Sequence, residues 1–203
     1  MMLICESEKL DDYLNELPEV NYSHPLIINT ITDLFNETQT QTERIQTAFE
    51  FVRDQISHSW DIKGKHVTCN ASDVLTYKEG ICYAKSNLLA ALLRSQGIPT
   101  GFCYQRLLLF DRTNSVYCIH ALNAVFLQSI NKWIKLDSRG NKKGIDAQFS
   151  VNEEKIAFFV NEENGEVNYP KIYTKPNMKT MEVLKQHTDP TLMYTLHLPD
   201  RLE

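Results

Sequence analysis

The feature that most constrains the fold is a segment from Ile81 to Pro99 with the apolar spacing of a long helix. Apolar or small side chains recur along it at intervals of three and four residues, at Ile81, Ala84, Leu88, Leu89, Ala91, Leu92 and Leu93. Gly97 and Pro99 then end it, because glycine suits the position after a helix and proline cannot continue one. The sequence therefore predicts a helix with a wide apolar face.

After this helix the apolar period changes to two residues. Three segments with this period follow, over residues 101–110, 116–127 and 132–137, and they predict three consecutive antiparallel strands. A polar turn at Asp111–Ser115 separates the first two, and a second turn is predicted near Gln128–Asn131. Helices first and strands later indicate the α+β class.

Three helices are predicted before the long one. The first lies near Glu8–Leu17 and ends at Pro18, the second begins about Pro25, and the third covers residues 40–56. The polar stretch Ser57–Asn70 is interpreted as a loop.

A short helix could follow over residues 70–77, capped by Asn70 or Ser72. The C-terminal pattern is weaker, with mixed strand and loop to about Pro176 and a helix near Met178–Gln186. We expect one domain over residues 1–203, made of an N-terminal helical part (1–56), a core (70–137) and a C-terminal extension (138–203).

Composition and charge exclude several functional classes. The 203 residues are 42% apolar and 23% charged, as in an ordinary globular protein, and this length can bury a substantial core. A net charge of -5 argues against nucleic-acid binding as the main activity. No stretch is long and apolar enough to span a bilayer, and acidic residues interrupt the apolar N-terminus, so neither a membrane protein nor a secretory signal is expected.

The cysteines point to a reducing environment. They are five in number and none forms a C-x-x-C pair: Cys5, Cys69, Cys82, Cys103 and Cys118. A disulfide scaffold is therefore not expected, and the cytoplasm is the predicted location.

Cys82 stands two residues after Gly80, at the start of the predicted long helix. A thiol there lies among unpaired backbone N–H groups at the positive end of the helix dipole, and both favour the nucleophilic thiolate. The same N–H groups can hold an oxyanion when a thiolate attacks a carbonyl. Gly80 is expected to allow a sharp entry into the helix and to leave room for a substrate. Position alone leaves a buried structural cysteine as the alternative.

His120 and Asp137 are predicted to lie side by side on the strands that follow. Alternation along residues 116–127 places His120 and Leu122 on one face. If the next turn is centred between Ser129 and Ile130, Leu122 lies opposite Asp137, and His120 and Asp137 become diagonal neighbours within reach. An odd loop or a bulge would change this register.

Taken together, these segments resemble the transglutaminase-like superfamily, a branch of papain-like thiol enzymes. The resemblance covers residues 70–137 and rests on EGICYAKSNLLAALLRSQGIPTGFCYQRL, HALNAVF and WIKLD. These are similar to the family's Gly-x-Cys helix start, Gly-Ile-Pro helix end, His-x-x-Asn strand and Trp-x-x-x-Asp strand. The order Cys, His, Asp, with separations of 38 and 17 residues, fits this family, whereas papain has a far longer Cys-to-His separation.

The resemblance implies an enzyme in which Cys82 is the nucleophile, His120 the general base and acid, and Asp137 the residue that orients the imidazole. It implies a papain-like core, in which the helix carrying Cys82 packs on an antiparallel sheet carrying His120 and Asp137. Reaction would pass through a thioester acyl-enzyme on a protein, peptide or small amide substrate, without a cofactor, a metal, a nucleic acid or a membrane. Hydrolysis is preferred over transamidation, because cross-linking needs a site that admits an amine while limiting water.

The sequence departs from the family pattern at two places. Ala84 and Lys85 follow Tyr83, where many relatives have an acidic or aromatic residue, and Leu122 stands where a tryptophan is common. Both departures bear on the class of substrate.

The side chain that would complete an oxyanion hole is left open. Papain-like enzymes use an upstream glutamine, and the corresponding position here is Thr76. The alternatives are Trp60, His66, Asn70 and Gln105.

Two other interpretations compete with a thiol enzyme. A metal site could use Cys118 and His120, joined by Cys82 or Cys103, although no C-x-x-C or H-x-x-x-H spacing supports it. A non-enzymatic protein- or peptide-binding module on the same fold is the second, because a fold does not establish chemistry.

Overall fold

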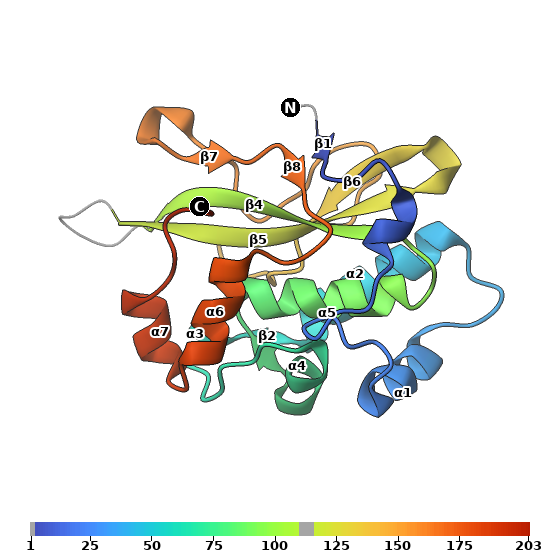
Figure 1. Cartoon of the computed structure of the whole chain (residues 1–203), viewed down its shortest axis with the longest axis horizontal. Helices are drawn as coiled ribbons and strands as arrows, with labels where there is room; N and C mark the ends of the chain where they lie inside the picture. The colour runs from blue at the N-terminus through green and yellow to red at the C-terminus, as the bar shows by residue number, and fades with distance from the viewer. Residues whose placement is uncertain (1–2, 110–115) are drawn as a thin grey trace.

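The computed structural model describes residues 3–109 and 116–203, and helix α5 (Cys82–Arg94) lies at its centre. All residues of α5 are buried, between the sheet strands β4 and β5 above and helices α4 and α1 below (Figure 1). Gly97 ends the helical segment with a φ of 68°, and the Ile98 N–H donates to the Leu93 carbonyl at 3.1 Å. The predicted helix is confirmed, and it is more fully enclosed than one apolar face requires.

The sheet has four antiparallel strands in the order β6-β5-β4-β7. They are β4 (Thr100–Leu109), β5 (Val116–Leu127), β6 (Lys132–Leu136) and β7 (Val167–Asn168). The three predicted strands are therefore confirmed, and the predicted turn at Asp111–Ser115 lies outside the described residues. A 3-10 turn at Gln128–Ile130 joins β5 to β6.

The two faces of the sheet pack on different parts of the chain. Ile119, Ala121 and Val125 of β5 belong to the main core around α5. The alternate residues Leu122 and Ala124 belong to a second apolar cluster, which also contains Tyr13, Cys103, Ile156 and Ile172. Two short strands, β1 (Ile4–Cys5) and β8 (Lys171–Ile172), pair in parallel. They join the N-terminal segment to the segment that follows β7 in the sequence (Figure 1).

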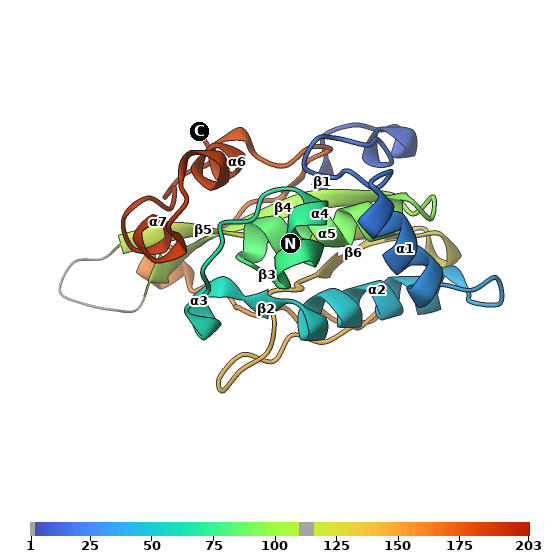
Figure 2. The ribbon, with the colours of Figure 1, turned by 90° about the horizontal axis from the view of Figure 1, so that it is seen from below.

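The helices before α5 cover its other sides, and Figure 2 shows α2 running alongside it. They are α1 (Pro25–Leu34), α2 (Gln41–Gln55), α3 (Ser59–Ile62) and α4 (Ala71–Tyr77). Thr40 caps α2 in a reciprocal capping box with Glu43, and the Asn70 N–H donates to the Asp73 carboxylate at the start of α4. The predicted starts at Pro25 and Asn70 are confirmed.

Two of the N-terminal predictions are wrong. The predicted helix at Glu8–Leu17 is only a 3-10 turn, Leu10–Tyr13, because the chain bends to bury Tyr13 and bring its hydroxyl to the Ser7 and Ile172 carbonyls, 3.3 Å away in each case. The predicted loop Ser57–Asn70 contains helix α3 and strand β2 (Ser57–His58), which pairs in parallel with β3 (Glu79–Gly80).

The C-terminal part ends in two helices. The predicted helix at Met178–Gln186 is confirmed as α6. A second helix, α7 (Pro190–Leu196), was not expected, although Asp189 caps it and Pro190 occupies its first turn. Helix α7 lies against α3, where Trp60 stacks on Tyr194 with ring centroids 4.3 Å apart. No helix in the described ranges has the length and apolar content that crossing a membrane requires.

Candidate active site

Cys82 occupies the first position of α5, directly after the short strand β3. The residue before Cys82 is Ile81, whose apolar side chain cannot cap the helix. The first backbone N–H groups of α5 therefore have no capping side chain. The Cys82 side chain lines a cavity, and the residue is 8% exposed. The cysteine therefore stands at the end of a buried helix and at the wall of a cleft.

Gly80 serves packing rather than substrate access. A Cβ at this position would lie 2.9 Å from Thr68 Oγ1 and 3.3 Å from the Ala84 Cβ. The expectation that Gly80 leaves room for a substrate is therefore wrong, because the protein itself fills that space.

The start of α5 reaches the sheet at an open edge of β5. Strand β6 pairs with β5 only as far as Leu136, which lies opposite Asn123, so β5 has no strand beyond it on that side. There the Ile119 N–H donates to the Pro199 carbonyl at 2.8 Å, and the Tyr83 hydroxyl donates to the Ile119 carbonyl at 2.8 Å. Although α5 packs on the opposite face of β5, this edge lets Cys82 come next to His120.

The register of the β5–β6 hairpin brings His120 and Asp137 together. Asn123 pairs with Leu136 and Val125 with Ile134, which is the predicted register. His120 Nε2 lies 2.8 Å from Asp137 Oδ2, and both residues are buried. The diagonal neighbourhood expected from the sequence is therefore present.

Asp137 is held as a carboxylate by several donors. Its two oxygens accept from the backbone N–H groups of Arg139 at 3.1 Å and Ala157 at 3.0 Å. Burial alone would raise the pKa of this carboxyl, but the positive charge of His120 and these hydrogen bonds outweigh it, and the pKa lies below its ordinary value. Asp137 thus fixes one edge of the imidazole.

His120 makes its second contact with Cys82. Burial opposes the charged ring, but the charges of Asp137 and Cys82 and a hydrogen bond to each outweigh burial and raise the pKa of His120 to about 10. Phe158 packs edge-on against the ring, with centroids 5.0 Å apart. The arrangement suits a thiolate–imidazolium pair.

The cleft around these groups has a volume of about 800 Å³. One wall is apolar and includes Leu107, Phe158, Phe159, Tyr194 and Leu198. Phe159 lines the cleft and is 75% exposed. The cleft can accept an apolar group next to the sulfur.

Three basic residues also line the cleft. Arg139 and Lys142 both pair with Asp61, Lys142 at 2.6 Å, and Lys143 also lines the cleft. Burial opposes the Asp61 charge, but hydrogen bonds from the two cations lower its pKa to about 2. Asp61 therefore stays ionised and holds the segment that follows Asp137 against α3.

Comparison with known families identifies the fold. Residues 29–138, more than half of the chain, match the transglutaminase-like superfamily. The chain belongs to this superfamily. No curated protein matches it as a relative. The α+β class and the papain-like core expected from the sequence are those that the structure has.

A solved structure shows the same fold. The crystal structure of a candidate cysteine protease from Cytophaga hutchinsonii is similar with a TM-score of 0.50 and 16% sequence identity. The likeness covers 66% of this chain and 43% of that protein, so this transglutaminase-like chain spans less than half of its length. At this identity the comparison concerns the fold.

The four side chains considered for an oxyanion hole differ in their places. Trp60 lines the cleft of this transglutaminase-like protein. His66 is bound to Glu79, Asn70 caps α4, and Gln105 Nε2 donates to the Phe158 carbonyl at 3.1 Å. These last three do not line the cleft.

His58 is the cleft residue that sequence reasoning missed. It lines the cavity with Cys82 and His120 and is 5% exposed. The segment Ser57–Asn70 reads as a polar loop, so its sequence carries no periodic signal that would bury a histidine. Only the parallel pairing of β2 with β3 reveals its place.

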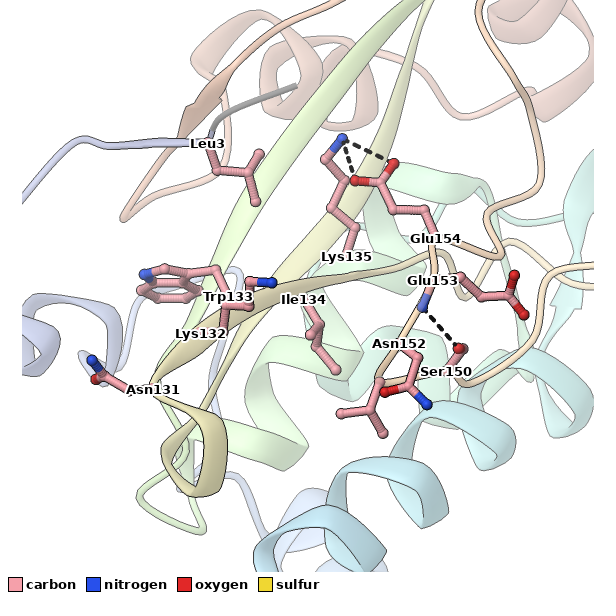
Figure 3. A pocket seen from close by; sticks show the side chains of 11 residues that line it. Leu3, Asn131, Lys132, Trp133, Ile134, Lys135, Ser150, Asn152, Glu153 and Glu154 are labelled. Atoms are coloured by element: carbon pink, nitrogen blue, oxygen red, sulfur yellow. Dashed lines mark hydrogen bonds and ion pairs between the residues drawn. The ribbon is translucent and has the colours of Figure 1, made fainter.

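A second cavity, of about 430 Å³, lies beside β6 (Figure 3). Lys135 and Glu154 pair across it, with 3.2 Å between their charged atoms, and Trp133 forms part of its wall. The residues that line it include neither cysteine nor histidine. Cys82, His58 and His120 line the larger cleft instead.

The structure gives the metal interpretation no ligand set. Within residues 3–109 and 116–203, no three His, Cys, Asp or Glu side chains form a group that could hold a metal ion. Cys103, one of its suggested ligands, belongs to the apolar cluster on the sheet with Leu122 and Ile172.

Proposed function

We propose that the protein is a cysteine-dependent acyl-transfer enzyme that acts on amide or peptide bonds through a thioester on Cys82. The observation that carries this proposal is the position of the His120 ring, which is hydrogen-bonded to Asp137 and lines the same cleft as Cys82. Cys82 and His120 line one cleft, and the buried Asp137 is hydrogen-bonded to His120, although the three residues lie far apart in the sequence.

In the first half of the reaction the Cys82 thiolate attacks the amide carbon. The carbonyl oxygen takes the electron pair and becomes an oxyanion, which the N–H groups at the start of α5 can receive. His120 then gives its proton to the leaving nitrogen as the C–N bond breaks. An amine leaves, and the acyl group remains on sulfur.

In the second half His120, now neutral, takes a proton from the attacking nucleophile. Water gives a carboxylic acid, and a primary amine gives a new amide. Phe159 and Lys142 line the cleft and are partly or largely exposed, so the cleft opens to solvent. We expect hydrolysis to prevail, because water then reaches the thioester.

Competitive alkylation tests whether Cys82 is activated. The protein is treated with a limiting amount of iodoacetamide at neutral pH, and the labelled cysteines are located by peptide mass spectrometry. Cys5 is exposed and supplies the internal control, while burial raises the pKa of Cys69 to about 11 and of Cys103 and Cys118 to about 12. We expect Cys82 to react before Cys5. Faster labelling of Cys5 would contradict an activated thiol.

Product analysis separates hydrolysis from transamidation. An acylated sample is divided between buffer and buffer with a fluorescent primary amine, and the fate of the acyl group is followed by chromatography. Release of mainly the free acid in both samples is the expected result. Quantitative transfer to the amine would instead establish transamidation.

A binding module on the same fold is the alternative function. It would keep the cleft and bind apolar peptides without turning them over. Unmodified recovery of every acyl donor, together with slow and equal labelling of the accessible thiols, would favour it.

A further inference from the structure

We propose that the imidazole of His58 donates a hydrogen bond to the carbonyl oxygen of the bound acyl donor and stabilises the oxyanion formed when Cys82 attacks. This inference rests on the proposed acyl-transfer function and names the side chain that completes its oxyanion site.

The backbone places His58 beside the nucleophile. Strands β2 and β3 are parallel, and His58 pairs with Gly80, two residues before Cys82. His58 and Cys82 line the same cleft. Because the pairing with Gly80 fixes the His58 backbone, the ring has a defined position relative to the start of α5.

The polar atoms of the ring lack partners in the described protein. Nδ1 is fully buried without a hydrogen bond. A buried polar nitrogen in this state costs about 1–3 kcal/mol unless a water or a ligand satisfies it. The ring is therefore maintained at the cleft for a partner that the folded chain does not itself supply.

The local field keeps this ring neutral. Burial, followed by the positive charge of Arg139, holds the pKa of His58 well below its ordinary value. A neutral imidazole carries one N–H, and the lowered pKa makes His58 a weak base that does not compete for the proton that His120 exchanges. Two histidines in one cleft thus have separate roles, one as a proton carrier and one as a neutral donor.

Trp60 is the competing donor, and its surroundings favour His58. The indole of Trp60 stacks on Tyr194, and the residue is 41% exposed. His58 is buried, and hydrogen bonds in such water-poor sites stabilise developing charge most strongly. The step itself adds no bond to His58: its N–H stays in place while the carbonyl oxygen gains negative charge, and the charge leaves when the C–N bond breaks.

Comparison of two reactions of Cys82 tests this role. Alkylation by iodoacetamide forms no oxyanion, whereas acylation by p-nitrophenyl acetate does. The variants are His58→Leu, which removes the donor, and His58→Gln, which supplies an amide N–H. His197→Leu is the matched control, because His197 is exposed and does not line the cleft. Thermal unfolding verifies that each variant is folded.

We expect His58→Leu to lower the acylation rate by about 10²–10³-fold while alkylation stays within about threefold of wild type. His58→Gln should recover about tenfold of the lost acylation rate. Wild-type acylation in His58→Leu, or equal loss of acylation and alkylation, would overturn the inference and leave the proposed function standing. If the wild type is not acylated at all, it is the proposed function that fails.

Discussion

Two buried histidines line the same cleft, and their pKa values are shifted in opposite directions. Burial lowers the pKa of His120, but the negative charge of Asp137 and the proximity of Cys82 outweigh burial and raise this pKa to about 10. At His58, burial and the positive charge of Arg139 outweigh the negative charge of Asp61 and hold the pKa well below the ordinary value. The difference follows from the placement of single charges, and it gives each ring a distinct chemical state at neutral pH.

The raised pKa of His120 predicts a pH-dependent contribution to stability. The native state binds the His120 proton more tightly than the unfolded state, so this stabilisation is fully present below pH 6.5 and is lost as the pH rises to about 10. Asp137→Asn removes the main cause. We expect the free energy of unfolding of wild type, relative to this variant, to fall across that window in urea titrations. An unchanged difference at both ends would contradict the coupling.

At the residue scale, the sequence predicts contacts that follow from the alternation along a strand and from the register of a hairpin. The side chains of His120 and Asp137 meet because Asn123 pairs with Leu136 in the predicted register. His58 was beyond reach, because a two-residue strand leaves no alternation to recognise and its partner, Gly80, is more than twenty residues away.

Helix α5 connects the site to the rest of the fold through a buried lysine. Lys85 has no exposed surface, and its ammonium group donates to the Arg53 carbonyl at 3.4 Å and to the Ile56 carbonyl, at the C-terminal end of α2. Cations suit this end of a helix because its carbonyl groups are unpaired. Lys85, one of the residues at which the sequence departs from the expected family pattern, therefore joins α5 to α2.

Lys85 predicts the opposite pH dependence to His120. Burial, followed by the charge of Arg139, lowers the pKa of Lys85 from 10.5 to about 7. The unfolded state therefore binds more protons between these values, and wild-type stability rises with pH in this window. Lys85→Met removes the titrating group. In urea titrations, the free energy of unfolding of wild type minus that of the variant should therefore rise with pH across this window. A constant difference would mean that the native lysine titrates normally.

At the element scale, prediction succeeded where a long apolar period was present. Helix α5 and strands β4, β5 and β6 carry such periods and were found. The turn at Leu10–Tyr13 was mistaken for a helix, because burial of Tyr13 against β8 decides its shape. Helix α7 has only seven residues, so its start signals had no periodic segment to support them.

In the whole molecule, the cleft is assembled from segments far apart in the sequence. Helix α3 precedes Cys82 in the sequence, whereas helix α7 lies near the C-terminus, and Trp60 and Tyr194 join the two helices by stacking. The Pro199 carbonyl covers the open edge of β5 at Ile119. Such long-range contacts leave no local pattern, which is why the sequence did not reveal the C-terminal wall.

Removal of this wall should affect binding more than chemistry. Tyr194→Ala removes the stack with Trp60 and part of the apolar surface beside the sulfur, so we expect KM for apolar acyl donors to rise more than kcat falls. Tyr77→Ala is the matched control. Tyr77 stacks on His66 with ring centroids 4.0 Å apart, and neither residue lines the cleft. Equal kinetic effects of the two substitutions would indicate that only stability had changed.

Trapping of the covalent intermediate tests the account most directly. Wild type, Cys82→Ala and His120→Gln are mixed briefly with a panel of activated acyl donors, quenched in acid and measured by intact-protein and peptide mass spectrometry. We predict that one acyl group appears on the peptide containing Cys82 in wild type, is absent from Cys82→Ala, and accumulates far more slowly in His120→Gln. Acylation that is equal in wild type and Cys82→Ala, or that leaves Cys82 unmodified with every donor, would contradict the account.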